Sequence, residues 1–291
     1  MTEPVPTTPA APAPIRWPAE AIWEAVAPLL PGFTVEVLPS IDSTNTELMR
    51  RAREGRQEAI LLVAEQQTAG RGRLGRPWRG ELGDALTFSI GLPLAPRDWS
   101  GLSLAVGVSV AESLQPELPA AGSETPRIGL KWPNDLWLSG DHKLAGILVE
   151  TASFVAAEAY GAGASGLNSF NNAERYVVIG IGINVRAPEG DGLSTVPGSL
   201  QQIDPRWDAP QALGAIVPAL VGMLGAFASQ GFAPLQPRFA LRDALAGRAV
   251  NLSDGSAGLA QGVAADGALL VQTPQGVVSV TSSEISVRPQ A

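Results

Sequence analysis

Apolar residues recur along the chain at two spacings, one typical of helices and one typical of strands. Apolar side chains three or four positions apart predict helices over 19–30, 102–114, 211–230 and 234–246, although Gly214 and Pro218 weaken the third. The polar run 42–45 can cap a further helix that continues through Arg53. Short runs rich in Val, Ile and Leu predict strands at 33–38, 59–65, 86–92, 128–138, 144–150 and 176–185.

The pattern changes after Arg248. From there, short β segments are separated by turn pairs, which predicts a small β-barrel of roughly 45 residues, and these pairs are Asp254-Gly255, Asp266-Gly267 and Gln275-Gly276. We therefore expect a large domain over 19–246 and a C-terminal barrel domain over 247–291. The Pro- and Ala-rich segment 1–18 is expected to be a disordered tail, and 158–173, rich in Gly, Ala, Ser and Asn, a flexible loop.

Composition narrows the range of partners. The 291 residues include 20 basic and 28 acidic side chains, for a net charge of −8. General attraction to nucleic acid or to anionic lipid is not expected, so any bound anion must be held locally. The chain has no cysteine and a single histidine, His142, which argues against disulfides and a zinc site. We see neither a secretory signal nor an uninterrupted apolar run of membrane-spanning length, and we expect a cytoplasmic protein.

The segment 65–79 carries four arginines within nine residues, spaced by glycines. Such a loop can wrap around a phosphate or an acyl phosphate. A solvated basic loop or a nucleic-acid contact fits the composition equally well.

Two further motifs place charged groups beside apolar strands. In Lys131-Trp132-Pro133-Asn134-Asp135, the lysine could face a phosphate and the aspartate a metal or a ribose, but an ordinary turn after a strand gives the same pattern. Lys143 opens an apolar strand, so a carboxylate or phosphate partner is expected unless its side chain reaches into solvent.

Two motifs have weaker meaning alone. The run 43–45 could cap a helix or present hydroxyls and an amide to a ligand. The glycines of 180–185 permit close backbone approach, but no third glycine follows to make a dinucleotide fingerprint. A Walker-type phosphate loop is also absent from the sequence, so standard nucleotide motifs do not indicate ATP use.

Taken in order, these motifs resemble the bacterial biotin–protein ligase family. They are Ser-Thr-Asn at 43–45, Gln-Gln-x-x-Gly-Arg-Gly-Arg-x-Gly-Arg at 66–76, Lys-Trp-Pro-Asn-Asp at 131–135, Lys-Leu-Ala-Gly-Ile at 143–147 and Gly-Ile-Gly-Ile-Asn-Val at 180–185. The resemblance implies an α+β fold: a class II aminoacyl-tRNA synthetase-like mixed sheet with flanking helices, plus a small C-terminal SH3-like β-barrel. Some members also carry an N-terminal DNA-binding domain. Only 42 residues precede Ser43, so we do not expect transcriptional control.

The resemblance also implies roles for individual residues. The catalytic set would be Lys143, Asp135 and Arg73. Biotin would be bound by Ser43, Thr44, Asn45, Gln67, Gly70, Arg71, Gly72, Arg73, Lys143 and Gly146. The nucleotide would be bound by Arg71, Arg73, Arg76, Trp78, Lys131, Asn134 and Asn184. No protein metal cluster is expected, since Mg²⁺ would arrive with the ATP phosphates and could contact Asp135.

The implied reaction uses ATP, Mg²⁺ and biotin to form biotinyl-5'-AMP, and then transfers biotin to a lysine of the biotin carboxyl carrier protein of acetyl-CoA carboxylase. The protein would act as a monomer or a homodimer, without nucleic acid or membrane. Two alternatives are a lipoate or octanoate ligase or transferase of the same fold, and a non-catalytic biotin-sensing protein. The arginine loop and Lys-Trp-Pro-Asn-Asp favour biotin over lipoate, and the presence of both Lys143 and Asp135 favours an enzyme over a sensor.

Overall fold

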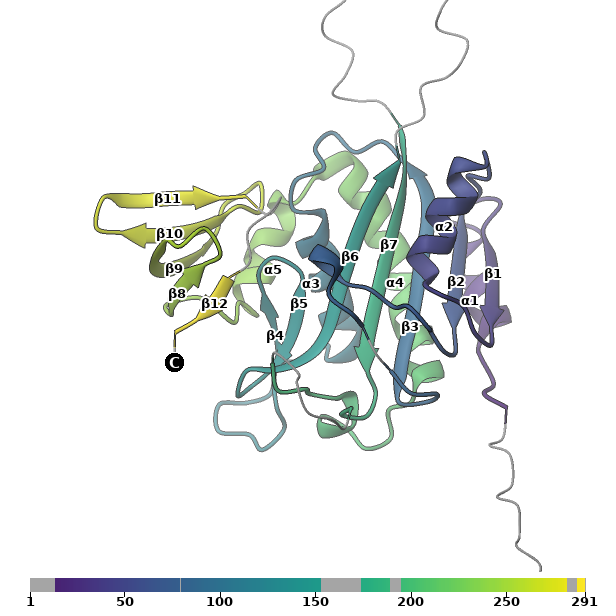
Figure 1. Cartoon of the computed structure of the whole chain (residues 1–291), viewed down its shortest axis with the longest axis horizontal. Helices are drawn as coiled ribbons and strands as arrows, with labels where there is room; N and C mark the ends of the chain where they lie inside the picture. Colours follow the sequence, from purple (N-terminus) through teal and green to yellow (C-terminus); the bar gives the residue numbers. More distant parts are fainter. Residues whose placement is uncertain (1–13, 79, 153–173, 189–194, 282–286, 291) are drawn as a thin grey trace, which may run out of the picture.

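The structure is a computed structural model that describes residues 14–78, 80–152, 174–188, 195–281 and 287–290. Most of the predicted tail and the whole predicted loop at 158–173 lie outside these residues. The described chain forms a seven-stranded sheet flanked by helices and a separate five-stranded sheet at the C-terminus (Figure 1).

The larger sheet has the strand order β1-β2-β3-β7-β6-β5-β4. Its strands are β1 (Thr34–Leu38), β2 (Ile60–Ala64), β3 (Ala85–Leu94), β4 (Ile128–Lys131), β5 (Asp135–Leu138), β6 (His142–Ala152) and β7 (Arg175–Asn184). Only β1 and β2 pair in parallel, while the other neighbours are antiparallel. The mixed sheet with flanking helices that the family resemblance implies is confirmed.

Helices cover both faces of this sheet because its strands alternate apolar side chains between the two sides. In β2, Leu62 packs with helix α2 (Thr44–Arg53), while Leu61 and Val63 join the larger core on the opposite face. That face carries α1 (Ala19–Val26), α3 (Leu102–Leu114) and α4 (Ala209–Gln230). Figure 1 shows α2 on one side of the sheet and α4 passing on the other. The α2 face is thinly covered, and this leaves room for a cavity.

Helix α4 runs unbroken for 22 residues despite Pro218. It begins where Asp208 accepts a hydrogen bond from Gln211 N (2.8 Å), which satisfies a free amide of the first turn. By length and composition alone, α4 could cross a membrane. In this fold, however, its apolar stripe, which includes Leu213, Ile216 and Leu220, is buried in the core against α3 and β3.

Three predicted elements differ from those observed. Helix α1 ends at Val26 instead of residue 30. The strand expected over 128–138 is a hairpin, because the chain turns at 132–134 between β4 and β5. The helix expected over 234–246 is only α5 (Gln236–Ala240), preceded by a short 3-10 turn. The following residues instead extend the sheet edge, since Leu130 N donates to Arg242 O (2.6 Å) and Ala244 N donates to Leu130 O (3.0 Å). Open backbone groups of edge strand β4 therefore decide the conformation of this segment.

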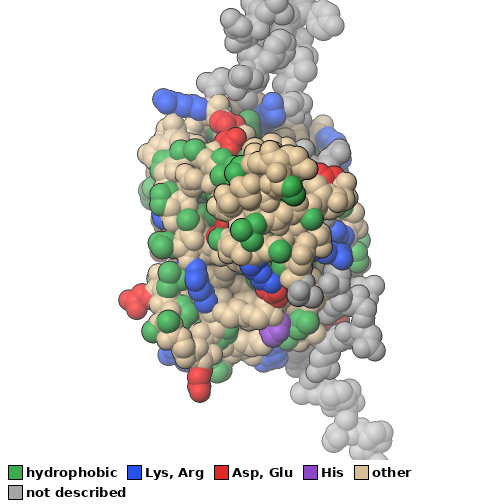
Figure 2. All heavy atoms as spheres, turned by 90° about the vertical axis from the view of Figure 1, so that its left-hand side faces the viewer, with side chains coloured by type: hydrophobic (Ala, Val, Ile, Leu, Met, Phe, Trp, Pro, Cys, Tyr) green, Lys and Arg blue, Asp and Glu red, His purple; other side chains and the backbone are tan. Residues whose placement is uncertain are grey.

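The C-terminal strands form an antiparallel sheet of order β11-β10-β9-β8-β12. They are β8 (Ala249–Leu252), β9 (Ala257–Val263), β10 (Leu269–Thr273), β11 (Gly276–Val280) and β12 (Val287–Pro289). Short β segments separated by turns were predicted here and are confirmed, while closure into a barrel stays a prediction. The sheet is joined to the larger domain: its buried residues share one core with it, and Trp132 Nε1 donates to Gly267 O (3.0 Å). Figure 2, seen from this side, shows mostly uncharged surface over the sheet.

Candidate functional site

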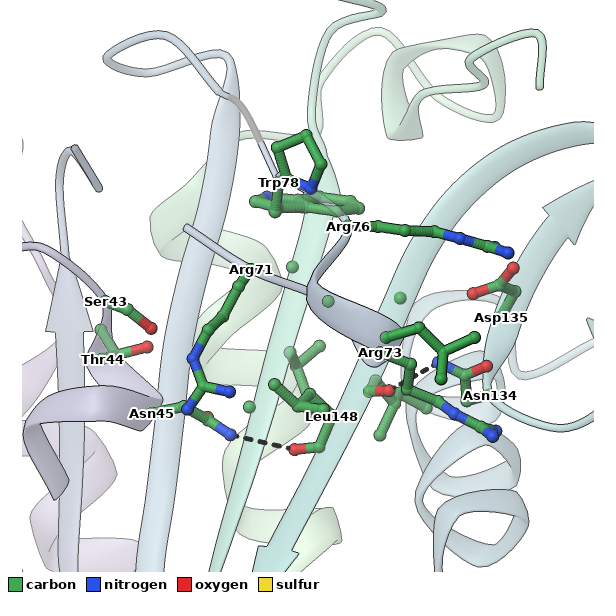
Figure 3. Close-up of a pocket in the computed structure, with 18 of the residues that line it drawn as sticks. Ser43, Thr44, Asn45, Arg71, Arg73, Arg76, Trp78, Asn134, Asp135 and Leu148 are labelled. Carbon is green, nitrogen blue, oxygen red and sulfur yellow. Dashed lines mark hydrogen bonds between the residues drawn. The ribbon is translucent and has the colours of Figure 1, made fainter. Parts of the chain in front are cut away.

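A cavity of about 110 Å³ opens on the α2 face of the sheet. It lies between the arginine-rich segment, the N-terminus of α2 and strands β5, β6 and β7 (Figure 3). Of the residues predicted to form the site, its lining includes Ser43, Thr44, Asn45, Gln67, Arg71, Gly72, Arg73, Arg76, Trp78, Lys131, Asn134, Asp135, Lys143 and Gly146. The fold thus brings together five sequence motifs that are separated by up to about 140 residues of chain.

The arginine-rich segment folds as a small hairpin over the cavity, which we call the arginine hairpin and define as residues 70–78. Trp78 N donates to Gly70 O (2.8 Å) and Gly72 N donates to Arg76 O (2.7 Å). The tip turns at Leu74 and Gly75, which have φ values of 57° and 68°, and glycine adopts this conformation without steric cost. The predicted loop therefore has a defined shape.

The arginines of the hairpin point in two directions. Arg71 Nη2 lies 2.9 Å from Glu150 Oε2, and Figure 3 shows its side chain directed toward Asn45 and Leu148. Arg73 and Arg76 extend toward the opposite end of the cavity, where Asp135 lies. Burial lowers the pKa of Arg73, and the charge of Asp135 partly offsets this effect. Arg71 is therefore paired with Glu150 at one end of the cavity, while Arg73 and Arg76 extend to the end at which Asp135 lies.

Asp135 lies between two lysines, Lys131 and Lys143, which are the only lysines of the whole sequence. Lys143 Nζ donates to Asp135 Oδ1 (2.8 Å), and Lys131 Nζ lies 3.8 Å from Asp135 Oδ2. The carboxylate partner predicted for Lys143 is confirmed. Lys131 is the more deeply buried lysine, with 10% of its side chain exposed against 31% for Lys143. Burial lowers the pKa of Lys131.

The other end of the cavity is polar but mostly neutral. Gln67 Oε1 accepts hydrogen bonds from Thr44 N (2.8 Å) and Thr44 Oγ1 (3.2 Å). Ser89 Oγ, fully buried in β3, lies 2.7 Å from Thr44 Oγ1 and 2.6 Å from Asn45 Oδ1. Ser43 caps α2 by accepting a hydrogen bond from Thr46 N (3.4 Å), and it also lines the cavity. The two alternatives for this motif, a helix cap and a cavity contact, are therefore compatible.

Two glycines of β7 allow side chains to lie directly on the strand. A Cβ on Gly180 would overlap Asn45 Oδ1, and a Cβ on Gly182 would lie 2.5 Å from Trp78 Cε2. The close approach predicted for these glycines is confirmed, and what approaches is an amide and an indole. Apolar residues also line the cavity: Phe88, Ile147, Leu148 and Ile181.

Two predicted residues lie outside the lining. Gly70 forms the base of the arginine hairpin, where a Cβ would lie 2.6 Å from Trp78 O. Asn184 Nδ2 donates to Lys143 O (3.2 Å) and Gly198 O (3.0 Å), so this amide ties together the backbone beside the cavity. Their predicted ligand contacts stay predictions.

Sequence reasoning missed Ser89 and assigned no role to Glu150. A signal for Ser89 exists, because Thr87 and Ser89 alternate with Leu86, Phe88 and Ile90 along β3 and so face the thinly covered side of the sheet. Glu150 gives no comparable signal, since an acidic residue near the end of a strand is usually solvated.

The cavity lining, within the described part of the chain, offers few metal ligands. Among the described residues no three His, Cys, Asp or Glu side chains are grouped, and Asp135 is the one carboxylate in the cavity lining. Because Lys131 and Lys143 already flank Asp135, a divalent cation would need most of its ligands from elsewhere, such as phosphate oxygens and water.

The fold is that of biotin protein ligases. The structure matches the biotin protein ligase from Aquifex aeolicus in complex with biotin and ATP with a TM-score of 0.68 and 26% identity, covering 88% of this chain and 99% of that one. In sequence, it is 34% identical over 266 residues to the bifunctional ligase/repressor BirA of Escherichia coli (89% of this chain, 75% of BirA). It is also 30% identical to the biotin–[acetyl-CoA-carboxylase] ligase of Paracoccus denitrificans (86% of this chain, 98% of that protein).

Family models agree with these relatives. The model of the biotin/lipoate A/B protein ligase family matches residues 37–165, and the model of the biotin protein ligase C-terminal domain matches residues 246–288. The chain belongs to the biotin protein ligase family.

Proposed function

We propose that this protein is an ATP-dependent ligase that forms biotinyl-5'-AMP from biotin and ATP and then transfers biotin to a lysine of a biotin carboxyl carrier protein, that of acetyl-CoA carboxylase. One observation supports this above all. In a chain of net charge −8, five cationic side chains and a single carboxylate line one cavity of the described structure, and the cavity continues into a neutral polar pocket. Such an arrangement suits a ligand with an anionic end and a neutral hydrogen-bonding end.

The two ends of the cavity suggest how the substrates lie. We assign the ureido ring of biotin to the neutral end, formed by Ser43, Thr44, Asn45 and Gln67, with Arg71 and the glycines of the arginine hairpin above it. The carboxylate of biotin would point to Lys143 beside Gly146. The nucleotide would take the end with Arg73, Arg76, Trp78, Lys131 and Asn134, with Asn184 holding the backbone behind Lys143.

In the first step, a carboxylate oxygen of biotin attacks the α-phosphorus of ATP, forming a C–O–P bond while the bond to pyrophosphate breaks. Negative charge builds up on the phosphate oxygens, and Lys143, Lys131 and Arg73 would stabilise it. Mg²⁺, bound through the phosphates and at most through Asp135, would neutralise further charge.

In the second step, the amine of the carrier lysine attacks the biotinyl carbonyl and AMP leaves. This amine must lose a proton, and Asp135 is the carboxylate at the cavity end where the phosphate would lie, between Lys131 and Lys143. Because an acyl phosphate is hydrolysed readily, closure of the arginine hairpin would protect it from water until the carrier arrives.

Lys143→Ala tests the assignment. Purified protein, ATP, Mg²⁺, labelled biotin and a carrier domain are mixed, and label on the carrier is followed over time. Loss of this fixed cation should cost about 3 kcal/mol in transition-state binding, a rate reduction on the order of a hundredfold. Arg206→Ala is the matched control, because Arg206 is 88% exposed and pairs only with Asp204 among the described residues. Equal labelling by wild type and Lys143→Ala would refute the role of Lys143.

The same mixture separates the alternatives, since the matched family model covers both biotin and lipoate ligases. Exchange of pyrophosphate into ATP that depends on biotin and ignores lipoate is expected. Lipoate-dependent exchange would show a lipoate ligase, and biotin binding without exchange or transfer would show a sensor.

Further features follow from the same proposal. We infer a cytoplasmic enzyme, monomeric or homodimeric, that needs neither nucleic acid nor membrane. We divide it at residues 246–247 into a catalytic domain and a C-terminal domain that closes into an SH3-like barrel. The family model that starts at residue 246 supports this boundary.

A further inference from the structure

Arg71 is held differently from the other arginines that line the cavity. Its Nη2 lies 3.0 Å from Glu150 Oε1 and 2.9 Å from Glu150 Oε2, and its Nε donates to Thr46 Oγ1 (3.1 Å). The pair is half-buried, with 37% of the Arg71 side chain and 25% of the Glu150 side chain exposed. Glu150 itself is outside the cavity lining. The contact therefore joins the base of the arginine hairpin to strand β6 and helix α2.

Glu150 also ends a chain of hydrogen bonds along the floor of the cavity. Its Oε2 accepts from Asn45 Nδ2 (2.9 Å), whose Oδ1 contacts Ser89 Oγ (2.6 Å). Thr44 then links Ser89 to Gln67, which lies three positions before Gly70, the first residue of the hairpin. The N-terminal arm of the hairpin is thus tied to the N-terminal part of α2 through polar contacts at two places, Gln67 and Arg71.

We propose that Glu150 is a positioning residue that holds the arginine hairpin closed over the activated biotin. The inference rests on the proposed function. Glu150 does not touch the reacting atoms; it fixes Arg71, and through Arg71 the angle of the hairpin whose tip carries Arg73. Opening the hairpin breaks the Arg71–Glu150 contact, so the strength of this contact sets how often water reaches the intermediate. The expected benefit is retention of biotinyl-AMP, with little effect on its formation.

Glu150→Gln is the informative change because it keeps size and removes charge. A carboxylate accepts from Arg71 and Asn45 with two oxygens, whereas a carboxamide has one oxygen and one NH2 group. One of the two donors must then face another donor. Thr46→Val is a second, milder change, which removes the acceptor for Arg71 Nε but leaves Glu150 and the cavity lining intact.

The experiment measures two quantities: the AMP released when no carrier is present, and the biotin delivered when carrier is present. The ratio of the first to the second reports how often the intermediate is lost to water. Wild type, Glu150→Gln and Thr46→Val are compared with Glu112→Gln, a control that breaks a surface ion pair with Arg238 between α3 and α5. Glu150→Gln should raise AMP released per biotin delivered by about tenfold, the scale of one lost hydrogen bond to a charged group. Thr46→Val should raise it less, and Glu112→Gln should match wild type.

Pyrophosphate exchange and thermal unfolding of each variant are measured alongside. If Glu150 merely stabilises the fold, exchange and transfer fall together and the ratio stays at the wild-type value, which overturns the inference. An unchanged ratio with normal exchange overturns it as well. If wild type shows no biotin-dependent exchange, it is the proposed function that has failed, and the inference falls with it.

Discussion

The contact between Gly182 and Trp78 allows a sharp test of how the arginine hairpin is seated. A Cβ on Gly182 would lie 2.5 Å from Trp78 Cε2 and 2.8 Å from both Cζ2 and Nε1. Carbon atoms pack best at about 3.5–4.0 Å, so the indole of Gly182→Ala must retreat by roughly 1 Å. Overpacking of this size typically costs about 1–3 kcal/mol. Trp78 ends the hairpin and its N bonds to Gly70 O, so the displacement should reach the whole hairpin.

We therefore expect Gly182→Ala to weaken biotin binding by about tenfold to a hundredfold, since each tenfold corresponds to about 1.4 kcal/mol. Calorimetric titration with biotin measures this loss, and urea unfolding measures how much of the strain is borne by the fold. Fluorescence of Trp78 should also change as its ring leaves the strand.

Gly225→Ala provides the matched control. It makes the same chemical change in α4, where a new Cβ meets nothing within 4 Å. Alanine favours a helix over glycine, so this variant should gain about 0.5–1 kcal/mol of stability and bind biotin like wild type. If Gly182→Ala binds biotin as tightly as Gly225→Ala, then Trp78 is not seated on β7 and the reasoning is wrong.

Two further variants test buried polar groups. Ser89→Ala removes a buried hydroxyl between Thr44 and Asn45, so it should lower the free energy of unfolding by about 1–3 kcal/mol and weaken biotin binding. Urea unfolding measures the first effect and calorimetric titration the second, and wild-type values in both would contradict the prediction. Asp243→Asn should stabilise the fold by about 1 kcal/mol near neutral pH, because burial raises the pKa of Asp243 and its Oδ2 has no hydrogen-bond partner in the described structure. A raised folded-state pKa means that folding takes up a proton, so wild type gains stability as the pH falls through that pKa and the advantage of asparagine shrinks. Urea unfolding of both proteins at neutral and mildly acidic pH measures this difference in stability. A stability advantage of Asp243→Asn that grows in acid would contradict the prediction.

Much of the fold could be predicted from periodicity alone. The helix at 102–114 and the buried strands around Leu61, Phe88 and Ile181 follow from the spacing of their apolar residues, and the helix at 44–53 follows from the polar run that caps it. The order of the motifs was equally informative about chemistry, because guanidinium, ammonium and amide groups that recur together beside glycines are typical of sites that bind anions. The family, the mixed sheet and the partner of Lys143 were accessible in this way.

The sequence did not predict elements whose conformation depends on partners far away in the chain. Residues 241–244 have helical composition, but helix α5 ends at Ala240, and the backbone groups of Arg242 and Ala244 bond instead to Leu130 at the open edge of β4. The strand expected over 128–138 turns back on itself at Trp132, whose indole is anchored by Gly267 of the C-terminal sheet. Local propensity is worth tenths of a kilocalorie per residue, and backbone groups that would otherwise stay unpaired outweigh it.

Only the tertiary structure decided which arginines lie at which end of the cavity. The sequence by itself indicated that any bound anion must be held locally, because the net charge of the chain is −8, and it offered the glycine-spaced arginines as one way to hold it. It did not determine which of these arginines is engaged by a carboxylate of the protein itself. That depended on Glu150, 79 residues from Arg71, reaching the cavity edge from β6. Pairing of charges across strands is set by sheet register and helix placement, which no local stretch of sequence encodes.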